Sequence, residues 1–303
     1  MYQLFIDSIF NPLVKRPLFL MAYFVFCLLH IKKWKQFFDT YENQTALNRV
    51  QFFKTIYFNY RSLPGNQAKL FPIYIYSDVE IISSSGRISL ECDTIQQGMI
   101  RWGWFYSFRS QGVSRINNQG LIKIYDGGGR FLRGSEITVR KGACLSIGRN
   151  FFVGENTSIY CWHEITLGKF VRLTYQSQIF DTDFHYSVNS TTGEVKQYYA
   201  SIRIGDYNWI GNRATIKKGT ITPDHLTVAA PNSMLGKDYS SLPPYSIIGG
   251  SPAKLLKTGY SRIWNNEMQR IAEIEEWYKQ NPEGKTFSFD LSEMPLEEIT
   301  EEI

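Results

Sequence analysis

The chain has 303 residues, of which 43% are hydrophobic and 20% are charged, and its formal net charge is +5. A chain of this length and composition can bury a sizeable core in one or two domains. Its basic residues are scattered and form no continuous basic face, so the pattern does not indicate a nucleic-acid binder. The four cysteines lie far apart without a CxxC pair, which excludes a disulfide framework or a cysteine zinc site and indicates a reducing compartment.

The N-terminal region contains an apolar run, Leu18–Leu29, flanked by Lys15 and Arg16 on one side and Lys32 and Lys33 on the other. The run is shorter than the roughly 18–20 residues needed to cross a bilayer, and no small-residue cleavage site follows it. Two interpretations stay open. The run forms a helix packed against its own protein, or a helix lying on a membrane surface. Both predict a cytoplasmic protein, in the second case held peripherally at the inner membrane face.

Residues 1–75 are predicted to form a helical, aromatic-rich extension. The stretch LNRVQFFKTIYFNYRSLP has apolar residues at helical spacing, and Leu63-Pro64-Gly65 ends the predicted helix. The residues expected on its apolar face are Val50, Phe53, Ile56 and Tyr57.

Beyond this extension, aliphatic residues recur every six positions. The clearest runs are Ile147, Val153, Ile159 and Ile165; Leu167, Leu173 and Ile179; and Ile204, Ile210 and Ile216, then, after a miss at Thr222, Val228 and Met234. An α-helix cannot use this period, because successive aliphatic residues would rotate around its axis and would not share one face. Short strands that turn three times per coil can use it, with each aliphatic residue pointing into a triangular prism.

This pattern resembles the hexapeptide-repeat acyltransferases, whose fold is a left-handed parallel β-helix. The resemblance implies a mainly β chain with the β-helix over residues 76–258, weakly marked up to about 135 and clear afterwards. The domains on either side would be the N-terminal helical extension, 1–75, and a C-terminal helix with an acidic tail, 259–303.

The C-terminal stretch YSRIWNNEMQRIAEIEEWYKQNP is predicted to form a helix with one apolar face. We expect this helix to cover the open end of the coil stack and to protect the last strand edges from pairing with another chain. The residues expected on this face are Ile263, Met268, Ile271, Ile274 and Trp277.

Two segments, IRIGDYNWIGNRATIKKGTI and PPYSIIGGSPAKLLK, closely resemble the acetyl-CoA-binding end of the sugar O-acetyltransferases, which include the maltose, galactoside and capsular-polysaccharide enzymes. The resemblance implies acetyl-CoA as co-substrate and no metal. Two departures from the family pattern are Thr222-Pro223 in place of Ile-Gly and Ala230-Pro231-Asn232 in place of Ala-Gly-Ser. The implied acetyl-CoA residues are Trp209, Gly211 and Asn212 at the thioester end of the arm, Ala230 along pantetheine, and Lys237, Lys254 and Lys257 near the nucleotide phosphates.

The stretch FDTDFHY contains His185, which lies 24 residues before Trp209. In the resembled family a histidine stands at a coil end about this far ahead of the matching tryptophan. The resemblance therefore implies that His185 is a general base. An imidazole can take the proton of a sugar hydroxyl at neutral pH as that hydroxyl attacks the thioester. Asp183 and Asp181 are candidates to orient the imidazole, and His163 and Asp181 are expected near the acceptor.

The sequence therefore predicts an acetyl-CoA-dependent O-acetyltransferase of a sugar hydroxyl, acting on a cell-surface polysaccharide or its precursor. Its partners would be acetyl-CoA, a carbohydrate acceptor and, in the membrane interpretation, a lipid surface. The resemblance also implies a homotrimer with active sites between neighbouring prisms. Two alternatives remain: an N-acetyltransferase of an amino sugar or another small-molecule acetyltransferase, and a non-catalytic β-helix scaffold.

Overall fold

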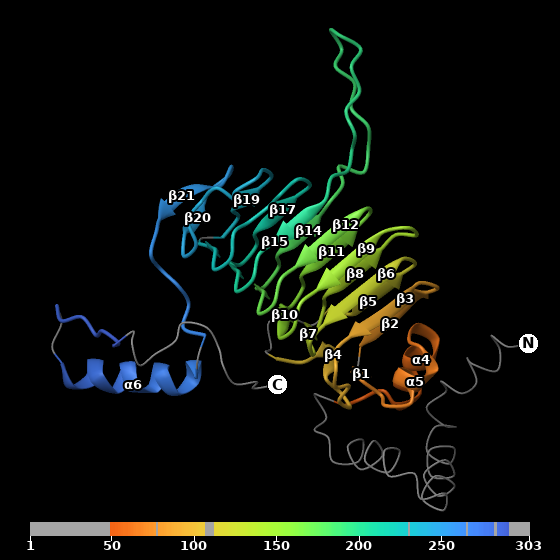
Figure 1. Cartoon of the computed structure of the whole chain (residues 1–303), viewed down its shortest axis with the longest axis horizontal. Helices are drawn as coiled ribbons and strands as arrows, with labels where there is room; N and C mark the ends of the chain where they lie inside the picture. Colours follow the sequence, from red (N-terminus) through yellow and green to blue (C-terminus); the bar gives the residue numbers. More distant parts are fainter. Residues whose placement is uncertain are drawn as a thin grey trace, which may run out of the picture.

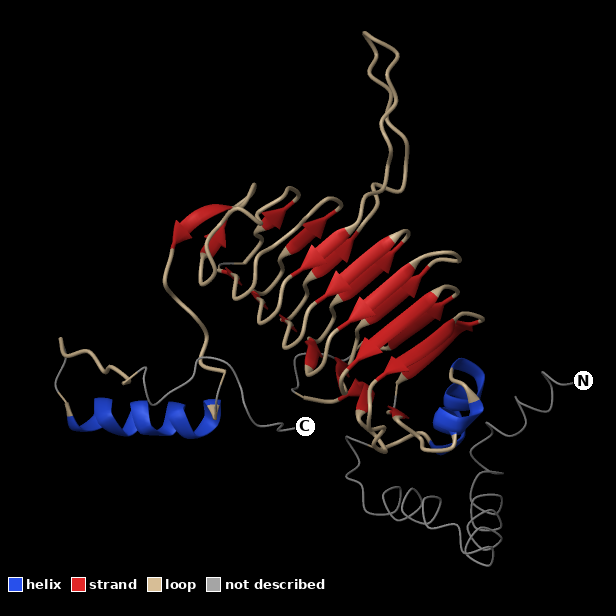
Figure 2. Cartoon of the chain, in the orientation of Figure 1, coloured by secondary structure: helices blue, strands red, loops and turns tan. Residues whose placement is uncertain are grey.

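The computed structural model describes residues 49–76, 78–106, 112–229, 231–264, 266–281 and 284–290. These residues form a three-sided prism built from three sheets (Figures 1 and 2). The nine-stranded sheet runs in the order β1 (Ile73–Ile75), β4 (Ile100–Trp104), β7 (Gly129–Leu132), β10 (Phe151–Val153), β13 (Arg172–Leu173), β16 (Trp209–Ile210), β18 (Thr227–Val228), β20 (Ile247–Gly249) and β21 (Lys254–Lys257).

The other two sides of the prism are a seven-stranded and a five-stranded sheet. The seven-stranded sheet holds β2 (Val79–Ser84), β5 (Ser114–Asn118), β8 (Glu136–Val139), β11 (Ser158–Cys161), β14 (Gln178–Phe180), β17 (Thr215–Lys217) and β19 (Met234–Leu235). The five-stranded sheet holds β3 (Arg87–Glu91), β6 (Leu121–Tyr125), β9 (Cys144–Ile147), β12 (Glu164–Leu167) and β15 (Ile202–Ile204). From β1 to β20, consecutive strands lie in different sheets. Neighbouring strands pair in parallel, except that β21 pairs antiparallel with β20 in the same sheet. The predicted left-handed parallel β-helix is confirmed.

The six-residue period places its aliphatic residues inside the prism. Ile147, Val153 and Ile159 are at most 1% exposed, and each stands beside its counterpart one coil later, Leu167, Leu173 and Ile179. The predicted inward position of Met234 is wrong. Leu235 is the buried residue and pairs with Ile216, because the corner between β18 and β19 contains one residue more than the corner between β16 and β17.

The first coils are filled by aromatic side chains, which explains why the repeat is weak before residue 135. Trp102, Phe131 and Phe151 lie inside the prism, with ring centroids 4.1 Å apart for the first pair and 4.8 Å for the second. The strands here are also longer, up to six residues in β2, so the spacing departs from six. The coil stack begins at β1, which pairs with β4, slightly before the predicted boundary at residue 76.

The N-terminal end of the prism is closed by α4 (Phe52–Ser62), followed by the short α5 (Gly65–Ala68). The predicted helix is present, but its buried face differs from the predicted one: Phe53 and Ile56 are half-buried and Tyr57 is exposed. The face that packs on the prism consists of Phe52, Thr55, Phe58, Asn59 and Ser62.

Polar residues are buried on this face because the edge strand β1 needs hydrogen-bond partners. The amide of Asn59 donates to the carbonyl of Ile73 at 2.7 Å and accepts from its N–H at 3.2 Å. The Thr55 hydroxyl accepts from the Ile75 N–H at 3.1 Å. The helix thus supplies by side chains the partners that a preceding strand would otherwise provide.

The C-terminal end of the nine-stranded sheet is covered by β21, which turns back antiparallel on β20. The predicted helix is present as α6 (Glu267–Gln280), but none of its residues is buried, and Met268 is 76% exposed. In Figure 1, α6 lies beside the prism and not across its last coil. The strand edge of β20 is therefore protected by β21, a role that was predicted for the helix.

The apolar run Leu18–Leu29 and the acidic tail after residue 290 lie outside the described residues. Among the helices that the structure does describe, none combines the length and apolar character that spanning a membrane requires.

Replacing Asn59 tests its role at the edge of β1. Asn59→Ala leaves the N–H and C=O of buried Ile73 without partners, so the free energy of unfolding should fall by about 3 kcal/mol. Urea denaturation followed by circular dichroism measures the change. Asn66→Ala, an exposed asparagine on α5, serves as the control, and equal stability of the two variants would contradict this role.

Candidate active site

The chain leaves the prism between β14 and β15 as a projecting arm, residues 183–199, drawn in green in Figure 1. Its two limbs approach each other antiparallel at Val188 and Val195, and at the base Thr182 pairs with Tyr199. The predicted excursion from the coil is therefore present. Because β14 belongs to the seven-stranded sheet and β15 to the five-stranded sheet, the arm leaves from the corner between these two sheets.

His185 lies near the base of the arm and is exposed. Its imidazole forms no hydrogen bond or ion pair with any part of the chain that the structure describes. Asp183, which we predicted as its orienting partner, instead forms an ion pair with Lys218, with 2.7 Å between Oδ2 and Nζ. The imidazole is thus open to groups from outside its own chain.

Lys218 anchors the arm to the next coil. Besides the Asp183 carboxylate, its ammonium donates to the carbonyl of Gln197 at 2.8 Å. Both limbs of the arm are therefore held by one side chain that follows β17 directly. Sequence reasoning did not assign Lys218 this role, because its two contacts lie 35 and 21 positions earlier in the chain.

The predictions that Asp181 orients His185 or contacts the acceptor are wrong. Asp181 is fully buried, and its carboxylate accepts the backbone N–H groups of Trp162, His163 and Glu164 at 2.7–2.8 Å. Burial raises the pKa of Asp181, and the three N–H donors act in the opposite direction. Its oxygens stabilise the turn before β12 and face no solvent, so they cannot meet a substrate.

His163 lies on that turn, one coil before the arm. Its ring is exposed and packs against Tyr199 at the arm base, with 4.9 Å between ring centroids. Phe184, next to His185, packs edge-on against Trp162 at 5.2 Å. His163 and His185 therefore both lie at the corner between the seven-stranded and five-stranded sheets, beside a partly exposed aromatic cluster.

The predicted acetyl-CoA residues lie elsewhere on the prism. Trp209 points outward from β16 in the nine-stranded sheet and is 38% exposed, and Gly211 and Asn212 form the corner that follows. Lys254 and Lys257 are exposed on β21 of the same sheet. Ala230 lies outside the described residues.

Lys237 does not join this group. It follows β19 at the corner between the seven-stranded and five-stranded sheets, two coils after the arm base, and its ammonium lies 5.2 Å from the centre of the Tyr239 ring. Within one chain, His185 and Trp209 are therefore on different sides of the prism.

Among the described residues, no three His, Cys, Asp or Glu side chains gather as the ligands of a metal ion.

Known proteins support the class indicated by the fold and the motifs. No family model matches the chain. The chloramphenicol acetyltransferase of Klebsiella aerogenes is 36% identical over 74 residues, which cover 24% of this chain and 32% of that protein. The galactoside O-acetyltransferase of Escherichia coli is 28% identical over 118 residues, 38% of this chain and 55% of that protein. The chain thus matches about half or less of the length of these curated relatives.

The solved structures to which the chain is similar include the polySia-specific acetyltransferase NeuO, with a TM-score of 0.43 and 14% identity over 70% of this chain and 95% of that chain. A hexapeptide-repeat-containing acetyltransferase from Vibrio cholerae has a TM-score of 0.29 and 24% identity over 40% of this chain and 62% of that chain. The resemblance to the hexapeptide-repeat acyltransferases is confirmed over the matched segments.

Removing the anchor at Lys218 tests how the arm is held. Lys218→Ala should speed amide hydrogen exchange in residues 183–199, while the melting temperature changes little because a partly exposed ion pair contributes about 0–1 kcal/mol. Hydrogen exchange with mass spectrometry measures the rates. Lys217→Ala at the neighbouring position is the matched control, and identical arm exchange in the two variants would show that Lys218 does not hold the arm.

Proposed function

We propose that this protein is an acetyl-CoA-dependent O-acetyltransferase that transfers an acetyl group to a sugar hydroxyl. The observation that carries the proposal is the position of His185: an exposed imidazole without a partner in the described chain, on an arm that projects from a hexapeptide-type prism. The sequence matches to acetyltransferases of chloramphenicol and galactosides support the same reaction class. The acceptor would be a cell-surface polysaccharide or its precursor.

In this mechanism His185 acts as the general base. Its imidazole takes the proton of the acceptor hydroxyl while the hydroxyl oxygen attacks the thioester carbonyl of acetyl-CoA. The resulting tetrahedral oxyanion is stabilised by a backbone N–H donor of an adjacent coil. When the intermediate collapses, the C–S bond breaks and the CoA thiolate takes the proton back from the imidazolium. The transfer is direct, so no acyl-enzyme forms.

The donor end of the site would come from Trp209, Gly211 and Asn212, with Lys254 and Lys257 near the nucleotide phosphates. Because these residues and the arm lie on different sides of one prism, we propose that each active site forms between two chains of a homotrimer. His185 and His163 of one chain would then face the acetyl-CoA residues of its neighbour, and Lys237 would lie on the arm side of the site. Asp183 would hold the arm in place through its ion pair with Lys218, and would not orient the imidazole.

The alternative acceptors, an amino sugar or another small molecule, would use the same base and differ only in the acceptor pocket. A non-catalytic scaffold would bind no acetyl-CoA and would tolerate any substitution at His185.

Substitution of the proposed base is the direct test. His185→Ala should lower kcat for acetyl transfer to an oligosaccharide panel by about 10²–10⁴-fold, because general-base assistance is lost. The affinity for acetyl-CoA, measured by calorimetry, should stay unchanged. Thr191→Ala at the tip of the same arm is the control. A wild-type rate in the His185 variant would contradict its assignment as the base.

Mixing two inactive variants tests whether the site is shared between chains. If the base and Trp209 come from neighbouring subunits, co-expressed His185→Ala and Trp209→Ala chains should regain about a quarter of the wild-type sites in random trimers. Activity of the purified mixed oligomers measures this recovery. An intrachain site would give none, since every chain carries one of the two substitutions.

A further inference from the structure

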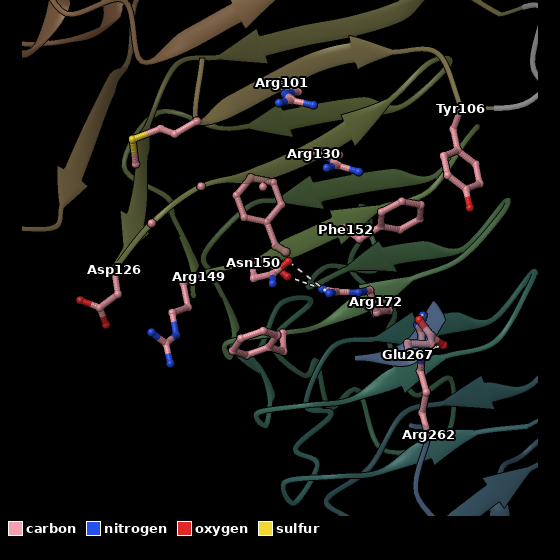
Figure 3. A pocket seen from close by; sticks show the side chains of 16 residues that line it. Arg101, Tyr106, Asp126, Arg130, Arg149, Asn150, Phe152, Arg172, Arg262 and Glu267 are labelled. Carbon is pink, nitrogen blue, oxygen red and sulfur yellow. Dashed lines mark hydrogen bonds and ion pairs between the residues drawn. The ribbon is translucent and has the colours of Figure 1, made fainter. Parts of the chain in front are cut away.

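A groove of about 200 Å³ crosses the outer face of the nine-stranded sheet, on another side of the prism from the arm. Figure 3 shows this groove with Arg101, Arg130 and Arg172 one below another. The groove is lined by five guanidinium groups, those of Arg101, Arg130, Arg149, Arg172 and Arg262.

Strand register explains the line of arginines. Arg101 on β4 pairs with Arg130 on β7, Arg130 pairs with Phe152 on β10, and Phe152 pairs with Arg172 on β13. Neighbouring strands in a sheet are about 4.8 Å apart, so three steps separate Arg101 from Arg172 by about 14 Å. The positive charges therefore form a column along the prism and not a compact cluster.

The described residues that line the groove include two carboxylates, those of Asp126 and Glu267. Glu267 is engaged by Arg262, with 2.9 Å between Oε1 and Nε. Arg101 and Arg130 form no ion pair with any described residue. Burial lowers the pKa of Arg130, and the charge of Arg101 lowers it further. Two adjacent, partly buried guanidinium groups of like charge are costly unless an anion joins them.

Other groups in the groove fit a sugar ring. Tyr106 is 65% exposed and packs edge-on against Phe152, with 5.8 Å between ring centroids. These rings stand beside the arginine column, so a pyranose can lie on an aromatic surface while its acidic substituent meets a guanidinium. Asn150 holds the Arg172 guanidinium in place through its carbonyl and its side-chain oxygen.

We propose that this groove is a binding site for an acidic glycan, a linear saccharide that carries carboxylate or phosphodiester groups along its length. The column of Arg101, Arg130 and Arg172 would bind successive acidic groups, and Tyr106 and Phe152 would contact the sugar rings. The identification of the bound glycan as the acetyl acceptor rests on the proposed function. The binding of the glycan to the groove does not depend on that function. The arm of the same chain leaves from the opposite corner, so the groove holds the polymer at a distance from its own His185.

The geometry disfavours other anions. A single phosphate cannot contact arginines about 14 Å apart. Trp209, which we place at the thioester end of acetyl-CoA, is next in register after Arg172, and Arg262 lies 5.6 Å from the centre of its ring. The groove therefore adjoins the acetyl end of the proposed donor site, whereas Lys254 and Lys257, proposed near the nucleotide phosphates, lie on β21 at the far end of the same sheet. A flat membrane surface would not reach guanidinium groups that are partly buried in a groove.

Binding of defined oligosaccharides to the full chain, without acetyl-CoA, tests the proposal. The probes are oligogalacturonate as the carboxylate chain, a polyribitol phosphate oligomer as the phosphodiester chain, and dextran oligomers as the neutral control, each followed by calorimetry. At least one acidic chain should bind, more weakly as salt is raised, and dextran should not. The double variant Arg101→Gln with Arg130→Gln should bind the acidic chain about tenfold more weakly or worse.

Arg115→Gln is the matched control, because Arg115 is a partly exposed arginine on β5 of the seven-stranded sheet. It should leave glycan binding unchanged. Without ligand, the double variant should melt no lower than wild type, since a repulsion between like charges is removed. This readout separates loss of a site from loss of the fold.

The proposal is overturned if neither acidic chain binds, if dextran binds equally well, or if the double variant binds as tightly as wild type. Loss of acetyl-CoA binding in the double variant would instead identify the groove as a nucleotide site, and binding of anionic lipid vesicles in place of both glycans would identify it as a membrane contact. Acetyl transfer measured separately with His185→Ala distinguishes failure of this inference from failure of the proposed function.

Discussion

The structure depends on one constraint: each coil must find its backbone hydrogen-bond partners in the coils before and after it. Parallel pairing between coils satisfies the interior strands, so only the two ends of the stack need other partners. At the first coil, Asn59 and Thr55 of α4 provide them, and at the last, β21 folds back on β20. The helix buries polar residues at this contact because the strand edge requires hydrogen bonds more than apolar contact.

The same pairing sets side chains from successive coils in columns. Inward columns of aliphatic and aromatic residues make the core, as with Ile147 and Leu167. At the corner between the five-stranded and nine-stranded sheets, Phe170, Tyr207 and His225 stack with 4.7 and 4.9 Å between ring centroids. These residues have positive φ, which is unfavourable for bulky side chains, and the stacking offsets that cost. Trp264 packs on Tyr207 and brings Arg262 to the groove.

An outward column has a different consequence, because its side chains line the surface groove. On the nine-stranded sheet it places Arg101 beside Arg130, and two coils later Arg172. On the other side of the prism, the arm exposes His185 without a partner in the described chain, while Trp209 points away from the arm. The rigid prism thus separates the groups proposed for catalysis, and oligomerisation is the physical means by which they would meet.

Several features were predictable from sequence because they depend on local spacing. The period of six identified the β-helix, since only inward residues of short strands recur in this way, and the polar stretch after His185 indicated the arm. Where the spacing changed by one residue, as before Leu235, or where aromatic residues filled wider coils, as at Trp102, the pattern failed or weakened.

The sequence by itself determined the repeat, the inward orientation of most core residues and the identity of the proposed base. Only the tertiary structure decided that Asp181 binds three backbone N–H groups, that Asp183 pairs with Lys218, and that arginines 29 and 42 positions apart in the chain form one column. The physical reason is that side-chain neighbours across coils are set by the length of each intervening turn and loop. A change of one residue there moves every later residue in register.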